Sequence, residues 1–130
     1  MEKQCIAVPG ISEMLEKSKI PLSPAVRAGD FVFVSGMPPI DRETGELIKG
    51  DIAAQTEQVL ENVKACLEAA GSSLDKVVKC NVYAANSGYF NAVNEVYARY
   101  FSHNPPARTF AAVGPWPMPF DIEIECVAIA

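Results

Sequence analysis

The chain has 130 residues, 49% of them hydrophobic and 21% charged, and its formal net charge is −5. This length predicts one domain, residues 1–130, that buries roughly two-thirds of its unfolded surface. The acidic charge argues against nucleic acid as a partner, because the chain's own field would repel phosphates. No apolar run is long enough to span a membrane.

The first third of the chain alternates short strands with loops. Residues 4–8 have the composition of a short strand, and "GISEMLEKSKIPLSP" is predicted to be irregular because prolines restrain its end. The β-branched and aromatic segment "DFVFVSG" (30–36) predicts a strand buried on both faces. The segment that follows, "PPIDRETGELIKG", is typical of a turn and loop.

Two amphipathic helices are predicted in the rest of the chain. Asp51 can cap the first, and Gly71 is a good stop for it. Ser87 can cap the second, which the prolines at 105 and 106 end. The segments 75–85, 107–113 and 121–129 read as strands. The first helix has one apolar stripe, which consists of Ile52, Val59, Leu60, Val63, Leu67 and Ala70.

This order of elements predicts an α+β fold with a single sheet and two helices. Two helices can cover only one face of such a sheet. In the strand at 30–36, Phe31 and Phe33 alternate with Val32 and Val34, so the second face is also largely apolar. An open apolar face would be a large exposed patch, and closed self-association covers it economically. We therefore expect a homo-oligomer.

Cysteine and histidine usage indicates no metal and no secretion. Four scattered cysteines form no CxxC pair and lie in apolar stretches, which favours buried free thiols in a reducing compartment. The single histidine, His103, cannot complete a zinc site with this cysteine spacing. The N-terminus lacks the charged and apolar regions of a signal peptide, so we expect a cytoplasmic protein.

Arg108 is the first candidate for a functional residue. It shares a strand face with Phe110, and its planar guanidinium suits bidentate binding of a carboxylate. Two interpretations stand at this point. Either Arg108 binds an anionic small molecule, or it forms a structural ion pair with Glu123 or Asp121 on the last strand.

Three further positions are candidates for the same site. Glu123 lies on one face of the last strand with Asp121 and Glu125, and is either solvated or a general base; beside a fixed arginine its ionised form would be favoured. Asn94 falls on the apolar stripe of the second helix, where a buried amide must be satisfied. Ser35 and Gly36 end the buried strand, and a glycine there either lets a ligand approach the backbone or makes a turn.

Five segments taken together resemble the Rid family, the reactive intermediate deaminases also called YjgF. They are "FVFVSG", "AAQTEQVLENVKACLEAAGSSLDKVVKCNVY", "FNAVNEVYARYF", "PPARTF" and "DIEIECVAIA", in this order and spacing. The resemblance spans about residues 18–129. It implies a chorismate-mutase-like α+β fold with two helices on one face of a mixed sheet. It also implies a homotrimer whose sheets form a central barrel, with clefts between subunits and no metal or organic cofactor.

The resemblance also implies a chemistry for these residues. Arg108 would hold the carboxylate of an enamine or imine derived from an amino acid, and Glu123 would position or activate water. Ser35, Gly36, Asn94 and the backbone beside Phe110 would line the cleft. The products would be ammonia and a 2-keto acid, so the partners expected are a small carboxylate-bearing imine or keto acid and copies of the chain itself.

The sequence departs from the family in two places. Leu22 stands where strongly active imine deaminases carry a tyrosine, and Phe110 with the segment Trp116-Pro117 suggests different pocket walls. Two alternatives therefore stand beside the simple imine deaminase. One is deamination of a larger unsaturated amino acid such as 2-aminomuconate. The other is a non-catalytic, chaperone-like trimer that binds a small carboxylate.

Overall fold

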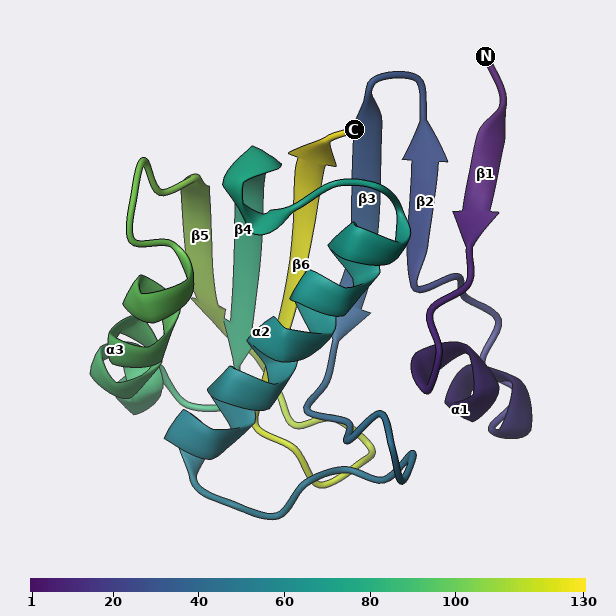
Figure 1. Ribbon diagram of the computed structural model, residues 1–130. Coiled ribbons are helices and arrows are strands. Elements are labelled where there is room, and N and C mark those ends of the chain that lie inside the picture. Colours follow the sequence, from purple (N-terminus) through teal and green to yellow (C-terminus); the bar gives the residue numbers. More distant parts are fainter.

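One six-stranded mixed sheet organises the computed structural model, which describes residues 1–130 (Figure 1). The strand order is β1-β2-β3-β6-β4-β5, in which β4 and β5 are parallel and the other neighbours are antiparallel. The strands are β1 (Lys3–Ile6), β2 (Ala25–Ala28), β3 (Phe31–Met37), β4 (Val77–Ala84), β5 (Ala107–Ala112) and β6 (Ile122–Ile129). The helices are α1 (Ile11–Lys17), α2 (Ile52–Ala69) and α3 (Phe90–Tyr100), with short 3₁₀ turns η1 (Leu74–Lys76) and η2 (Ser87–Tyr89).

Helix α2 forms as its sequence predicts. The Asp51 side chain accepts a hydrogen bond from the Ala54 backbone N–H at 2.9 Å, which satisfies one of the free donors of the first turn. The apolar stripe is buried against the sheet, and Val59, Leu60 and Val63 have no exposed surface. Gly71 follows the helix with φ +82°, a conformation that glycine adopts without strain.

Helix α3 begins differently from the prediction. Asn86, not Ser87, supplies the cap: its side chain accepts a hydrogen bond from the Gly88 backbone N–H at 2.7 Å and starts the turn η2. An amide side chain can bond the backbone two residues on, and this local turn delays the α-helix to Phe90. The helix then connects β4 to the parallel strand β5 (Figure 1).

The segment expected to be irregular contains a third helix, α1, so the prediction of two helices was wrong here. Its apolar residues Ile11 and Leu15 are four apart, and both are buried in the core. Gly10 starts the helix with φ +87°, and its N–H donates to the Glu13 side chain. In Figure 1, α1 lies below the lower ends of β1 and β2.

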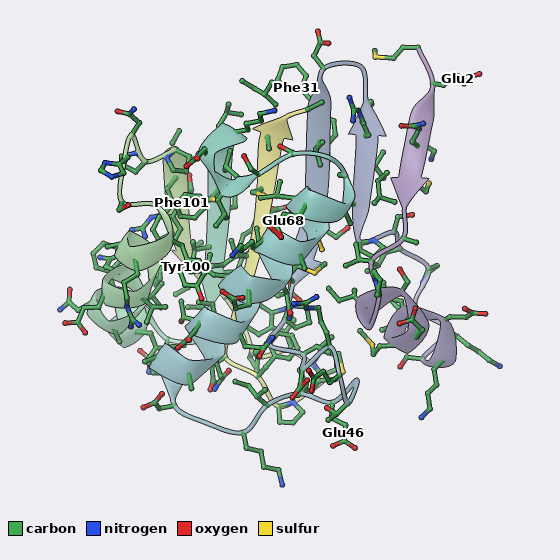
Figure 2. The ribbon with its side chains drawn as sticks, in the orientation of Figure 1. Glu2, Phe31, Glu46, Glu68, Tyr100 and Phe101 are labelled. Atoms are coloured by element: carbon green, nitrogen blue, oxygen red, sulfur yellow. The ribbon has the colours of Figure 1, made fainter.

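The two faces of the sheet differ, and α2 and α3 cover one of them (Figure 1). On this covered face Ile122, Ile124 and Ala128 of β6 have no exposed surface. On the other, open face, Phe31, Phe33 and Ile129 are 45%, 46% and 48% exposed. Figure 2 shows Phe31 at the upper end of β3. The strand at 30–36 is therefore buried on only one face in the single chain.

The four cysteines differ in burial. Cys66, Cys80 and Cys126 are buried free thiols, as the sequence predicts. Cys5 is exposed, because it lies on the edge strand β1, so the prediction was wrong for this residue. None of the helices has both the length and the apolar character needed to cross a lipid bilayer.

Candidate functional site

Arg108 lies on the edge strand β5, on the face that α3 covers. Its neighbour across the strand pair is Cys80, which in turn pairs with Cys126, and both thiols point into the core. The guanidinium carbon Cζ lies 4.8 Å from the ring centroid of Tyr97 and 5.6 Å from that of Phe90. Phe110 is on the same face, and its ring meets Phe90 edge to face at 5.1 Å. Arg108 thus sits half-buried among aromatic rings.

The structural ion pair that the sequence left open is not formed. Glu123 pairs with Tyr83 in the sheet register, so its side chain is on the open face, opposite to Arg108. Asp121 is occupied elsewhere, since it accepts a hydrogen bond from the Gln55 side chain at 2.9 Å. The guanidinium contacts rings rather than a carboxylate, and its donor fork is therefore available to a ligand.

A β-bulge places Ser35 and Gly36 on the open face. Val34 and Met37 of β3 pair with Cys126 and Ile124 of β6, so Ser35 and Gly36 together oppose one residue. The Ser35 hydroxyl donates to the Ser23 carbonyl at 2.7 Å and anchors the bulge to the segment before β2. Bulges often occur beside active sites because they redirect side chains and free backbone groups.

Glu123 lies directly over this bulge. A Cβ atom added to Gly36 would collide with the Glu123 Oε1 atom, so a glycine is needed for the carboxylate to occupy this position. Burial and, to a smaller extent, the neighbouring Glu125 raise the pKa of Glu123 above its ordinary value. The expectation that a nearby arginine favours its charge was wrong within one chain, because Arg108 is on the other face. A raised pKa suits a general base.

Asn94 belongs to the arginine side of the sheet. It lies four residues after Phe90 and three before Tyr97, on the face of α3 that meets Arg108. Its side-chain oxygen is buried and has no hydrogen-bond partner within the chain, and the same is true of the Tyr97 hydroxyl. Buried polar atoms are usually satisfied, so the Asn94 oxygen marks an incomplete polar site, whereas the Tyr97 hydroxyl lies beside the buried Cys80 thiol.

The predicted site residues therefore form two groups. The arginine half-site contains Arg108 with Phe110 and Asn94, and the glutamate half-site contains Glu123 with Ser35 and Gly36. They lie on opposite faces of one sheet, and a single chain does not bring them together. The sequence did not single out Tyr97 and Phe90 as site residues, although their spacing with Asn94 on one helical stripe was a usable signal.

Surface hollows of the single chain lie elsewhere. One of about 590 Å³ opens between α1 and the loop at 41–46 and is lined mainly by polar side chains around Arg42. Another of about 310 Å³ lies beside Leu22 and Ser23, near the glutamate half-site through the Ser35 contact. No group of three His, Cys, Asp or Glu side chains is placed to ligate a metal ion.

The sheet order, the bulge and the two half-sites define a class of α+β protein, and the comparisons identify its family. The family model described as Endoribonuclease L-PSP matches residues 14–130. A RutC family protein of Pyrococcus horikoshii is 52% identical over 108 residues, 83% of this chain and 86% of that protein. The chain belongs to the Endoribonuclease L-PSP family, which is the YjgF or Rid family.

Two further relatives bear on the fold and on the name of the family. Reactive Intermediate Deaminase A of Arabidopsis thaliana, a chloroplastic protein, is 41% identical over 108 residues, 83% of this chain and 58% of that protein. The crystal structure of the Rid family protein YyfA from Yersinia pestis has a TM-score of 0.90 at 34% identity and covers 99% of this chain and 100% of that one. The α+β fold implied by the resemblance is thus confirmed.

Proposed function

We propose that the protein is a hydrolytic deaminase of reactive enamine and imine intermediates of amino acids, releasing ammonia and a 2-keto acid. The observation that carries this proposal is the environment of Arg108: its guanidinium is half-buried among aromatic rings and has no carboxylate partner. A planar donor fork held in this way suits the carboxylate that every such substrate bears. The deaminase among the relatives supports the same reaction class.

The active site in this proposal is assembled from two copies of the chain. Arg108 and Glu123 lie on opposite faces of one sheet, so one substrate cannot contact both within a single subunit. A homotrimer that brings the arginine half-site of one subunit to the glutamate half-site of the next would complete a cleft at each interface. The exposed Phe31 and Phe33 on the open face favour such an assembly, because contact between copies would bury them.

The chemistry needs few groups. The enamine tautomerises to an imine, whose carbon is electrophilic, and Arg108 anchors the adjacent carboxylate. Glu123 takes a proton from water as the water oxygen bonds to this carbon, and the same proton then goes to the nitrogen. Glu123 then carries the hydroxyl proton of the carbinolamine to its nitrogen, the C–N bond breaks to release ammonia, and the C–O bond becomes C=O, which leaves the 2-keto acid. General base catalysis is typically worth about 10²–10⁴-fold, enough for substrates that already hydrolyse in water.

The experiment is a measurement of ammonia release from freshly generated imines. The panel contains small 2-aminoacrylate-type imines and 2-aminomuconate, and it compares the wild type with Arg108→Ala and Arg108→Lys. We expect acceleration by the wild type, loss in Arg108→Ala and partial loss in Arg108→Lys, because lysine keeps the charge but not the fork. Light scattering on each variant checks that the assembly is intact.

Each outcome has a defined meaning. A preference for 2-aminomuconate would indicate that the pocket around Leu22 takes a larger substrate. If no imine is accelerated, the deaminase proposal is wrong, and saturable binding of a 2-keto acid would then favour the carboxylate-binding trimer. RNA cleavage, which the family description names, is tested on the same preparations, and activity that survives in Arg108→Ala would be contamination.

A further inference from the structure

We propose that Tyr97 is a positioning residue whose ring holds the Arg108 guanidinium in the orientation that receives the substrate carboxylate. This inference rests on the proposed function, because it assigns Arg108 to the carboxylate. The residue acts through Arg108, and its own contact with substrate is not required. Arg108 has two aromatic contacts, and a long, flexible side chain is fixed only by a ring that is itself held in place.

A cation over the face of an aromatic ring is attracted by the negative charge density of that face when it lies within about 6 Å of the centroid. The Arg108 Cζ atom satisfies this distance for two rings, Tyr97 at 4.8 Å and Phe90 at 5.6 Å. Arg108 is on an edge strand and Asp121 and Glu123 are not its partners, so these rings are the contacts that restrain its guanidinium.

The two rings are not equivalent as supports. Tyr97 is only 7% exposed, whereas Phe90 is 43% exposed. The Tyr97 ring is itself packed against Phe101 with centroids 4.7 Å apart. Figure 2 shows Phe101 at the end of α3 nearest to β5. A buried ring wedged between a helix and a strand moves little, so Tyr97 offers the fixed surface and Phe90 a mobile one.

The ring rather than the hydroxyl performs this role. The Tyr97 hydroxyl is buried and has no hydrogen-bond partner within the chain, so it does not hold the guanidinium by a hydrogen bond. Burial raises the pKa of Tyr97 far above its ordinary value, so the side chain is a neutral phenol. Phenylalanine at this position keeps the ring face, and leucine removes it while remaining apolar.

Holding the guanidinium in place strengthens carboxylate binding without changing the reacting atoms. An arginine that is already ordered loses less conformational freedom when it binds. The carboxylate is bound equally in the ground state and in the transition state, so the effect falls on KM and not on kcat. A purely structural role for Tyr97 would instead reduce stability and lower the active fraction, and would leave KM unchanged.

The experiment compares Tyr97→Leu, Tyr97→Phe and Ile11→Ala in the intact assembly. Ile11→Ala is the control for loss of core packing, since Ile11 is also buried but lies on α1, far along the sheet from the edge strand β5. We expect the Kd for 2-oxobutyrate and the KM for imine to rise roughly 3- to 30-fold in Tyr97→Leu. We expect both to stay within about two-fold of wild type in Tyr97→Phe and Ile11→Ala, with kcat unchanged.

A second arm reads the position of Arg108 directly and weakens the ring face at 97. The NMR shifts of the Arg108 δ-protons report the ring currents of Tyr97 and Phe90, and phenylalanines of increasing fluorination at 97 weaken the ring face with little change in its shape. We expect Kd to rise with each fluorine and the ring-current shift to fall to the contribution of Phe90 in Tyr97→Leu. An unchanged shift in Tyr97→Leu, or equal Kd values across the fluorinated series, would overturn the inference. Failure of the wild type to bind or turn over any substrate would overturn the proposed function alone, with the NMR result unaffected.

Discussion

Glu123 is held where its charged form is disfavoured. Burial raises its pKa, so the fold favours the protonated carboxyl: this stabilisation is present below the ordinary value of 4.5 and is lost as the pH rises through the folded-state pKa. We therefore expect Glu123→Gln to have a higher urea midpoint than wild type at pH 7 and little difference below pH 4.5. We expect its kcat to fall about 10²–10⁴-fold, since the general base is lost.

The exposed loop glutamate Glu43 supplies the control for this change. Glu43→Gln should leave both the urea midpoint and kcat as they are, because Glu43 takes no part in the glutamate half-site. A midpoint for Glu123→Gln below that of wild type at pH 7 would show that the carboxylate stabilises the fold. The buried charge of Glu123 would then not lower the stability of the protein at pH 7.

Gly36 carries a second prediction at the residue scale. Its missing side chain is the space that the Glu123 carboxylate occupies, so Gly36→Ala must displace either the carboxylate or the bulge. We expect little loss of stability, because the atom displaced is the far end of the flexible Glu123 side chain, but a large fall in kcat as the carboxylate leaves its place. Gly114→Ala is the control, because nothing lies within 4 Å of the added Cβ there. Full activity in Gly36→Ala would mean that Glu123 need not lie over the bulge.

At the scale of the elements, the cap at the N-terminus of α2 tests how much a local side-chain contact stabilises the helix that covers the sheet. The Asp51 side chain caps the helix through Ala54, and the helix buries its stripe against the sheet. We expect Asp51→Ala to lose about 0.5–2 kcal/mol in urea unfolding, and Asp51→Asn to lose little, since asparagine also caps. Equal losses in both variants would indicate that charge, not the cap, matters.

Element patterns explain which parts of the fold were predictable. α2 has a capping side chain, a continuous apolar stripe and a stop glycine, and all three signals agree. In α1 only Ile11 and Leu15 mark the buried face, and the nearby prolines predicted irregular backbone instead. The start of α3 was misplaced because Ser87 and Asn86 are both good caps, and only the folded backbone selects the one whose oxygen meets a free N–H.

At the scale of the whole molecule, the open sheet face should drive assembly. Phe33 is 46% exposed and lies at the centre of this face, paired with Val127 of β6. We expect Phe33→Lys to lower the mass in solution from that of the proposed trimer to that of a monomer, because a buried unpaired charge at the interface is strongly unfavourable. Sedimentation velocity measures this.

Met118 provides the comparison for assembly, because it is 41% exposed and lies in a loop outside the sheet. Met118→Lys should keep the wild-type mass. If Phe33→Lys also keeps it, the open face is not the interface. In that case other surfaces would have to form the proposed site between subunits. If Phe33→Lys is instead monomeric and inactive, the result supports an active site shared between subunits.

The sequence by itself determined the fold class, most of the helices and strands and the candidate residues, because these depend on local patterns: apolar spacing, caps and the residue types that carry chemistry. Arg108, Glu123 and Gly36 were all identifiable in this way. Tertiary structure alone decided which of them share a face. β6 inserts between β3 and β4, and β5 becomes a parallel edge strand, so the two half-sites separate across one sheet. Strand pairing depends on contacts between distant segments, which no local pattern encodes. The same pairing placed Tyr97 against Arg108 and Glu123 over Gly36.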